Sequence, residues 1–402
     1  MKLKMRLNAL IVILAFYFRQ NLSFTHRGHI CRHISYDSVV CSRSDNLLHA
    51  SPKSKLATER KTFKRFFERE LWRSPELEDL YPILCSLESA CRDVNRLMRR
   101  ISTDNLQGDF TVIGNDSPIV NIQGEDQKKL DVIANRIFKT SLCVSGKVNV
   151  VASEEDDDIC LCSEVTRSPA FTGKYAAVFD PMDGSSNIDC GLSTGTIFGV
   201  YKRPSFGPSD DMSTIQQKGT ELLIAGYCLY SASTHLVLTI RSGVHQFTLD
   251  DVKGEFYLTR SNIRIPKSGP IYSINDANSN EWSQPMNRYI TDLKSGNLPR
   301  GNARSKPVAR YMGSLVADIH NILRKGGIFA YPAEASKPDG KLRLLYEALP
   351  IAMLVEEAGG KASSGRQRIL NLKVENIHQR TPFFVGSVDQ VTALDNYLSK
   401  EF

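Results

Sequence analysis

The sequence predicts an α/β fold built around a large sheet, and three observations lead to it. Apolar residues recur at intervals of three and four in residues 62–70 and 76–100, a pattern typical of amphipathic helices. Short β-rich runs separated by Gly and Asp turns follow, as expected for one large sheet. Beyond residue 263, strand and helix patterns alternate, which indicates an α/β domain. With 402 residues, of which 41% are apolar, the chain is long enough for two domains with a substantial core.

The first half of the predicted fold contains one more helix and seven strands. Helical spacing returns in residues 127–142, after a segment at 105–124 whose Gly, Asn, Asp and Pro residues predict a loop. The predicted strands cover residues 148–152, 175–179, 196–201, 222–230, 236–240, 245–249 and 256–259.

A second region begins near Ile263, where Pro266, Gly269 and Pro270 indicate a linker. The pattern then predicts a helix over 311–325, strands over 328–331 and 342–346, and a helix over 350–358 that ends at two glycines. We therefore expect an N-terminal α+β domain over residues 61–263 and a C-terminal α/β domain over 264–402.

The first 60 residues have the composition of a removable leader. They hold ten Lys/Arg against three Asp/Glu, which accounts for the whole net charge of +7. A basic start and the apolar run 7–18 predict a signal peptide over 1–23, too short to span a bilayer comfortably. Residues 24–60 are rich in Ser, His and Arg, as in a transit peptide. A signal peptide followed by a transit peptide predicts a bipartite leader that directs the protein to the plastid stroma. The secretory pathway and the cytoplasm are the alternatives.

The remainder of the chain is balanced, with 41 basic and 41 acidic residues. A near-neutral body gives no reason to expect a nucleic-acid partner. We also expect no membrane association once the leader is removed.

The nine cysteines have no repeated spacing, so we expect neither a disulfide framework nor a zinc site. Cys160 and Cys162 form the only close pair outside the leader, and their spacing is unlike a CxxC motif, so we expect free thiols. The others outside the leader lie in apolar contexts, and we expect small core residues at Cys85, Cys91, Cys143, Cys190 and Cys228.

The densest functional signal is the run VFDPMDGSS at residues 178–186. An apolar strand that ends in Asp180 and turns at a proline places Asp180 and Asp183 at a sheet edge, where both can face a common point. The amides of Gly184, Ser185 and Ser186 can then donate hydrogen bonds to a phosphate. Taken alone, the run also fits a tight turn.

Acidic residues from three further segments strengthen the functional interpretation. Glu154 and Glu155 end another predicted strand, Asp131 follows two lysines, and Glu347 lies at a strand-to-helix junction. Hard divalent ions such as Mg²⁺ need oxygen ligands of this kind. We therefore expect a metal site, whereas Asp156 and its two following acids are more typical of a solvated loop.

Long motifs resemble the fructose-1,6-bisphosphatase family over residues 62–395: VFDPMDGSSNIDCGLSTGTIFGVY, VASEED, QKKLDV, ARYMGSLVADIH, GGIFAYP and GKLRLLYEALPIAMLVEEAGG. The resemblance implies a layered α-β-α-β-α sandwich of the sugar phosphatase superfamily and a homotetramer. It also implies hydrolysis of the 1-phosphate of fructose 1,6-bisphosphate, in gluconeogenesis or the Calvin cycle. Two to three Mg²⁺ ions per subunit would assist, with Mn²⁺ as a substitute.

By the same resemblance, the metal ligands are Glu154, Asp180, Asp183, Glu347 and the main-chain carbonyl of Met182. Asp131 and Glu155 would orient the attacking water, and Glu125 stands where the family usually has a catalytic Asp. The sugar and its remote phosphate would bind to Asn275, Tyr311, Tyr331, Lys341 and Arg343, with Arg310 reaching in from a neighbouring subunit. Lys341 and Arg343 alternate on a predicted strand and so share a face.

Three departures from the family pattern concern affinity and regulation. A tyrosine expected shortly after Asn275 is replaced by Asn278 and Ser279. The Lys174–Tyr175 pair of the family's nucleotide-inhibitor site is present, but the Gly-Thr-Gly turn is absent, which argues against inhibition by AMP. Residues 202–222 lack the cysteines of the plastid redox loop, so we expect activity to change little between dithiothreitol and mild oxidant.

Two alternatives to this function remain open from the sequence. One is a neighbouring enzyme, a sedoheptulose-1,7-bisphosphatase or an inositol-phosphatase relative. NIDCGLSTGTIFG, YPA and GKLRLLYE favour fructose bisphosphate instead. The other is a non-catalytic protein that keeps the fold, against which stands the presence of the motif carboxylates.

Overall fold

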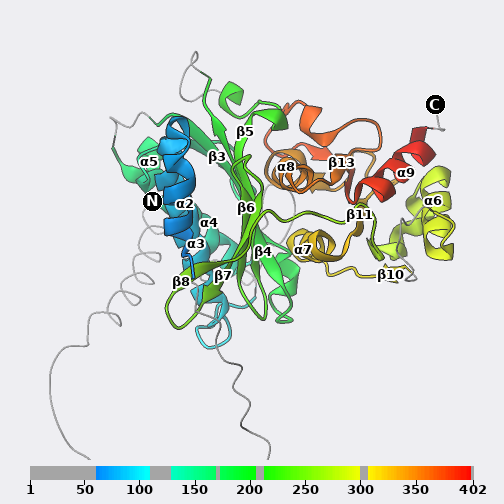
Figure 1. Ribbon diagram of the computed structural model, residues 1–402, viewed down its shortest axis with the longest axis horizontal. Coiled ribbons are helices and arrows are strands. Elements are labelled where there is room, and N and C mark those ends of the chain that lie inside the picture. The colour runs from blue at the N-terminus through cyan, green and yellow to red at the C-terminus, as the bar shows by residue number, and fades with distance from the viewer. Residues whose placement is uncertain (1–59, 109–127, 169–172, 205–211, 299–306, 400–402) are drawn as a thin grey trace, which may run out of the picture. The chain divides into compact units, whose positions relative to one another are not determined.

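The computed structural model describes residues 60–108, 128–168, 173–204, 212–298 and 307–399 (Figure 1). All of them belong to one compact unit, Thr58–Phe402. The predicted leader up to residue 59, most of the predicted loop at 105–124, and Glu125 lie outside the described residues.

Five layers build the described fold, in the order helix, sheet, helix, sheet, helix (Figure 1). The first layer contains α2 (Phe63–Trp72), α3 (Tyr81–Met98) and α4 (Lys129–Val144). The central layer contains α7 (Leu315–Lys325) and α8 (Leu349–Glu357), and the last contains α6 (Gln284–Ser295) and α9 (Val388–Leu398). This confirms the layered α-β-α-β-α sandwich that the resemblance implied.

An eight-stranded sheet lies between the first and central layers, in the order β2-β1-β3-β4-β5-β6-β7-β8. Among the described strands of this sheet, only β1 and β3 pair in parallel. In β3, Ala176 and Val178 face α7 and α8, while Ala177 and Phe179 face α3 and α4, as the alternation of a strand requires. The strands are β1 (Val148–Ser153), β2 (Cys160–Leu161), β3 (Tyr175–Asp183), β4 (Thr194–Lys202), β5 (Leu222–Tyr230), β6 (His235–Thr239), β7 (Val244–Asp250) and β8 (Glu255–Arg260).

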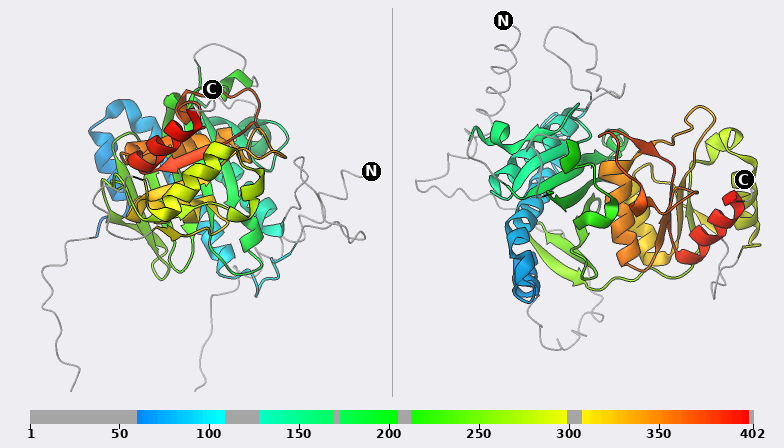
Figure 2. Two further views of the ribbon diagram at one scale, coloured as in Figure 1. Left: turned by 90° about the vertical axis from the view of Figure 1, so that its right-hand side faces the viewer. Right: turned by 90° about the horizontal axis from the view of Figure 1, so that it is seen from above.

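A second, five-stranded sheet separates the central layer from α6 and α9, as the view from above in Figure 2 shows. Its order is β10 (Val308–Ala309), β9 (Ile271–Ser273), β11 (Gly327–Tyr331), β15 (Phe383–Gly386) and β13 (Lys361–Ser363). A separate pair joins β12 (Leu342–Arg343) to β14 (Arg380–Thr381).

Short helical segments complete the described chain: η1 (Pro75–Leu80), α5 (Cys162–Thr166), η2 (Ser185–Asn187), η3 (Met212–Thr214), η4 (Gly219–Glu221), η5 (Asp276–Glu281), η6 (Leu344–Ala348) and η7 (Ile369–Asn371). No helix within the described ranges combines the length and the apolar composition that crossing a bilayer requires.

Two predicted elements of the C-terminal half are wrong in part. The helix predicted over 311–325 begins only at Leu315, because Gly313 adopts a φ of +72° and the Ser314 side chain caps the helix by accepting a hydrogen bond from Ala317 N. The strand predicted over 342–346 ends at Arg343, and η6 is a π-helical turn that leads into α8. Residues 344–349 are all buried, and a continuous apolar run has no period that separates strand from helix.

The expectation for the cysteines also needs correction, because Cys143 and Cys162 form a disulfide with a Cα–Cα distance of 5.0 Å. It joins the end of α4 to the start of α5. Cys190 is exposed and not in the core, whereas Cys91 and Cys228 are buried as expected. The bonded partners are 19 positions apart, and their spacing shows nothing of their contact in space.

Candidate active site

The site is built on the end of β3, where the strand contains a β-bulge. Asp180 pairs with Ile197 and Asp183 with Gly195, so β3 advances three residues while β4 advances two. Residues three apart on a regular strand face opposite sides, and the extra residue turns Asp180 and Asp183 to the same side. The Asp180 side chain provides a hydrogen-bond acceptor for the main chain of the bulge, because its Oδ1 accepts from Met182 N at 2.8 Å.

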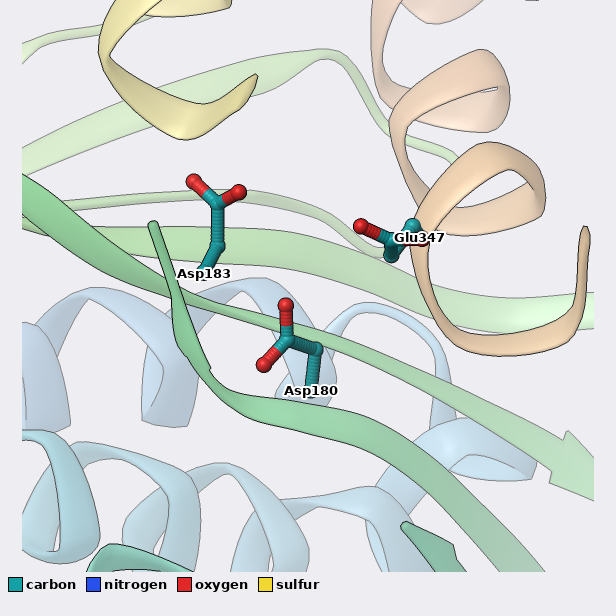
Figure 3. A group of neighbouring side chains, drawn as sticks. All are labelled: Asp180, Asp183 and Glu347. Carbon is teal, nitrogen blue, oxygen red and sulfur yellow. The ribbon is translucent and has the colours of Figure 1, made fainter. Parts of the chain in front are cut away.

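A third carboxylate comes from η6. Glu347 lies opposite the end of β3, and one carboxylate oxygen each of Asp180, Asp183 and Glu347 lie within 4.8 Å of one another (Figure 3). Glu347 accepts a hydrogen bond from the main-chain N of Arg343. All three acids are buried. The π-helical turn therefore brings a C-terminal acid to the two acids of the motif.

Asp183 is fixed by the N-terminus of α7. Its Oδ1 accepts from Leu315 N at 3.0 Å, and its Oδ2 accepts from Ser314 Oγ at 2.6 Å and from Val316 N at 2.8 Å. Helix N-termini stabilise negative charge through their free N–H groups. These bonds hold the carboxylate in one orientation toward the other two.

The electrostatics of this cluster are unbalanced. Burial, and then the charge of Glu154, raise the pKa of Asp180 and of Glu347. Burial also raises the pKa of Asp183, although the hydrogen bond from Ser314 opposes it. None of the three acids forms an ion pair with a Lys or Arg of the described chain. A cation bound among them would stabilise the ionised forms.

The remaining predicted acids lie beside this cluster. Glu154 follows β1, and its Oε1 is 3.7 Å from the guanidinium of Arg343. Asp131 lies in the first turn of α4, where its Oδ2 accepts from Lys128 N at 3.0 Å. Burial and, secondly, the neighbouring Glu155 raise the pKa of Asp131 to about 8. Asp131, Glu154 and Glu155 are thus electrostatically coupled.

A cavity of about 590 Å³ opens over the acids. The turn after Asp183 forms one wall, and Gly184 there has a φ of +75°. A Cβ at this position would lie 2.7 Å from the Cβ of Ser314, so only glycine fits between the two loops. The predicted residues that line the cavity are Glu154, Asp180, Met182, Asp183, Gly184, Ser185, Ser186, Tyr311, Tyr331, Lys341, Arg343 and Glu347.

The lining of the cavity also includes residues expected for the remote phosphate. The ammonium of Lys341 lies 5.8 Å from the centre of the Tyr331 ring. Arg343 is almost fully buried and lies against Glu154 on the acidic side. Asn275 and Arg310 do not line the cavity: Asn275 donates to Asn278 at 3.4 Å, and the exposed Arg310 donates to a main-chain carbonyl.

Sequence reasoning missed several residues of the site. Lys128 and Asp318 line the cavity, and Ser314 holds Asp183. Asn187 follows the turn at 184–186 and donates a hydrogen bond to the Met312 carbonyl. All four stand in or beside the motifs that carried the resemblance, and this proximity was the available signal.

The donor set fits a hard divalent cation. The three buried carboxylate oxygens converge, and none of these acids is ion-paired with a Lys or Arg of the described chain. Oxygen ligands of this kind are what Mg²⁺ or Mn²⁺ prefers. Asp180, Asp183 and Glu347 can hold such an ion directly, with Glu154 beside them.

Known proteins are similar to this chain over most of its length. The sequence model of the fructose-1-6-bisphosphatase N-terminal domain matches residues 61–261, and that of the C-terminal domain matches residues 265–399. A chloroplastic fructose-1,6-bisphosphatase of Pisum sativum is 44% identical over 337 residues, covering 80% of this chain and 79% of the relative. A cytosolic one of Solanum tuberosum is 42% identical over 354 residues, covering 88% and 98%.

Among solved structures, the fructose-1,6-bisphosphatase of Leishmania major in holo form is similar to this chain. It has a TM-score of 0.74 and 38% sequence identity, and the match covers 84% of this chain and 99% of that one.

Proposed function

The chain belongs to the fructose-1,6-bisphosphatase family, and from that premise we propose that it hydrolyses the 1-phosphate of D-fructose 1,6-bisphosphate. The products are fructose 6-phosphate and inorganic phosphate. One observation carries the proposal: three buried carboxylates, none of them ion-paired with a Lys or Arg of the described chain, converge on a cavity that a lysine and two tyrosines also line.

Metal ions belong to the proposal as cofactors. Glu154, Asp180, Asp183, Glu347 and the main-chain carbonyl of Met182 would hold two to three Mg²⁺ ions per subunit, with Mn²⁺ as a possible substitute. When bound, the ions supply neutralisation of the phosphoryl charge and activation of water.

The residues of the chain bind the phosphate and align the water. The amides of Gly184, Ser185 and Ser186 donate to the 1-phosphate, as a turn of exposed N–H groups does for anions. Asp131 and Glu155 orient the attacking water, and one of the two carboxylates accepts its proton as the water oxygen bonds to phosphorus. The bond from phosphorus to the sugar C1 oxygen breaks, and that oxygen takes up a proton. Glu125 is our candidate for the proton transfer, although it lies outside the described residues.

The other end of the substrate would meet Lys341, Tyr311 and Tyr331. Arg343, which lies against Glu154, and Asn275, which does not line the cavity, would have to turn toward it to take part. Lys341 supplies the positive charge on that side of the cavity. We propose a homotetramer in which Arg310 of a neighbouring subunit completes this pocket.

A phosphate-release assay tests the function. Fructose 1,6-bisphosphate and sedoheptulose 1,7-bisphosphate are compared with Mg²⁺ and with EDTA. We expect Mg²⁺-dependent release with a clear preference for the fructose compound. Preference for sedoheptulose bisphosphate would favour the neighbouring enzyme. Asn278 stands where the family has a tyrosine, and this exchange leaves room for such a preference. No release from either would support a non-catalytic relative.

We place the protein in the plastid stroma. The composition of the leader supports this location, as do relatives named chloroplastic from Pisum sativum, Brassica napus and Arabidopsis thaliana. The cytosolic relative of Solanum tuberosum keeps the cytoplasm as the alternative. Fusion of residues 1–60 to a fluorescent protein separates the two, and secretion of the fusion would indicate the signal peptide alone.

A further inference from the structure

A short loop connects the two ends of the candidate active site. It runs from Arg310 to Ser314, between β10 and α7. Tyr311 in this loop lines the substrate cavity, while Ser314 at its end holds Asp183 at 2.6 Å. A shift of this loop would therefore change the spacing between the sugar-binding wall and the acidic cluster.

Two side chains hold the main chain at the middle of this loop. Met312 N donates to both carboxylate oxygens of Asp318, at 3.3 and 3.1 Å. The Met312 carbonyl accepts from Asn187 Nδ2 at 2.9 Å, and the same amide donates to Ser193 O at 3.0 Å. Both side chains are at least nine-tenths buried. Neither Asn187 nor Asp318 has a role in the hydrolysis described above.

The two partners come from different parts of the site. Asn187 ends η2, directly after the turn whose amides would bind the 1-phosphate, and Asp318 lies in the first turn of α7, the helix that orients Asp183. Asn187 also packs against the loop, since a Cβ at Gly313 would lie 3.4 Å from its Oδ1. The residue that follows the phosphate turn thus holds the carbonyl of Met312, and α7 holds its N–H.

We propose that Asn187 and Asp318 are positioning residues that fix Met312, and through it the spacing between Tyr311 and the acidic cluster. The inference rests on the proposed function. Because a bisphosphate must reach both ends of the cavity at once, loss of this clamp weakens substrate binding more than it slows turnover. The Asp183 contacts come from residues 314–316 and remain in place.

The variants are chosen to separate positioning from general stability. Asp318→Ala removes both acceptors for Met312 N, while Asp318→Asn keeps one acceptor and the shape. Asn187→Asp keeps the shape but replaces the donor to the Met312 carbonyl by an acceptor. Asp292→Ala serves as a control, because Asp292 also accepts side-chain hydrogen bonds, from Tyr397 and Asn297, but on α6 away from the cavity.

Two measurements are compared for each variant at saturating Mg²⁺. Deuterium exchange of the peptide spanning residues 308–316 reports on the Met312 amide, and steady-state kinetics give KM and kcat for fructose 1,6-bisphosphate. We expect Asp318→Ala and Asn187→Asp to speed exchange and raise KM at least about fivefold, with kcat within about twofold. Asp318→Asn should recover most of the wild-type KM.

The inference would be overturned if Asp318→Ala kept the wild-type KM. It would also be overturned if Asp292→Ala raised KM as much as Asp318→Ala does. A kcat loss larger than the KM rise would also contradict it. Failure of the proposed function looks different, because the wild type itself would then release no phosphate from fructose 1,6-bisphosphate.

Discussion

The two ends of β3 use carboxylates in opposite ways. Before the strand begins, Asp79 lies between two lysines, with its Oδ2 at 3.1 Å from the ammonium of Lys174. Hydrogen bonds from Lys147 and Lys174 lower the pKa of Asp79. Where the strand ends, Asp180 and Asp183 lie beside Glu347 with raised pKa values and no ion pair within the described chain.

The difference separates a structural from a functional group of acids. At the start of β3, Asp79 has two cationic partners within the described chain, and the disulfide between Cys143 and Cys162 lies at the end of α4. At the end of β3, the chain gathers charge that something else must balance. Changes at the first end should therefore affect stability, and changes at the second should affect chemistry.

The largest effect is expected where the charge is unbalanced. Asp183→Ala and, separately, Glu155→Gln should lower kcat for fructose 1,6-bisphosphate at least about a hundredfold, a typical loss when acid–base or electrostatic assistance is removed. Phosphate release measures this, with Asp79→Ala as the control from the other end of the strand. Undiminished release by Asp183→Ala would refute the assignment of the site.

The disulfide should affect stability and leave chemistry intact. Replacing Cys143 and Cys162 by Ala removes a link across a 19-residue separation, which typically costs about 2 to 3 kcal/mol of unfolding free energy. Urea denaturation measures the cost, and replacement of the free Cys160 is the control.

Activity of the native protein should hardly change between dithiothreitol and mild oxidant, because both bonded cysteines are fully buried and therefore shielded from the reductant. A several-fold gain on reduction that the double variant lacks would show instead that this disulfide is a switch.

The pH dependence of stability should differ in sign between Asp131, which lies beside the acidic cluster, and Asp79, which lies near the start of β3. Burial raises the pKa of Asp131 from 3.8 to about 8, so the unfolded chain ionises first as the pH rises. Stability of the metal-free protein should therefore fall between about pH 4 and pH 8, by up to about 1.4 kcal/mol per pH unit for one group. Asp79 has a lowered pKa, and its contribution is instead lost as the pH falls below its unfolded value.

Thermal unfolding in EDTA tests this, with Asp131→Asn as the matched variant. The difference in Tm between wild type and Asp131→Asn should grow from pH 5 to pH 8. Mg²⁺ should reduce it, because cations offset the repulsion from Glu154 and Glu155. A constant difference would contradict the raised pKa of Asp131.

Lys341→Ala should have a smaller effect, confined to substrate binding. A remote phosphate contributes mostly uniform binding, so KM for fructose 1,6-bisphosphate should rise about tenfold and more than kcat falls. The nearby exposed Lys337→Ala provides the control. A purely kcat effect would place Lys341 in the chemistry.

The smallest effect is expected for Asp79→Ala. Its two ion pairs are partly exposed, and such pairs contribute about 0 to 1 kcal/mol each. Turnover should stay within about twofold. Because Lys174 is already paired with Asp79, AMP should hardly inhibit the wild type. Strong inhibition by AMP would show that this end of β3 binds anions in spite of its internal partner.

The sequence was most informative where structure depends on near neighbours. The strands from β1 to β8, except the short β2, were predicted from alternation and turns, and the run around Asp180 was recognised from its local motif. Glu347 was also singled out, although the segment containing it was predicted as a strand. Its identity followed from the motif, whereas its geometry depends on a π-helical turn that no periodicity indicates.

Contacts between distant segments could not be predicted. The disulfide, the pairing of Asp79 with Lys147, and the clamp on Met312 each join residues from separate elements. Asn187 and Asp318 belong to quoted motifs, but the partner of each is a main-chain group of another segment. When a side chain forms hydrogen bonds with main-chain groups, its partner can be any residue type, so the sequence does not identify the partner.

The bulge in β3 makes the spacing of the site depend on parity. Two acids three positions apart behave as if they were two apart, because one residue of β3 has no counterpart on β4. Loss of that residue would restore even pairing and keep both carboxylates on one side. Gain of a residue with the bulge retained would turn Asp183 to the opposite side while leaving every acid present in the sequence. The bulge and the spacing of the two acids must therefore change together, and a homologous chain can keep every acid of the motif and still lose the site when only one of them changes.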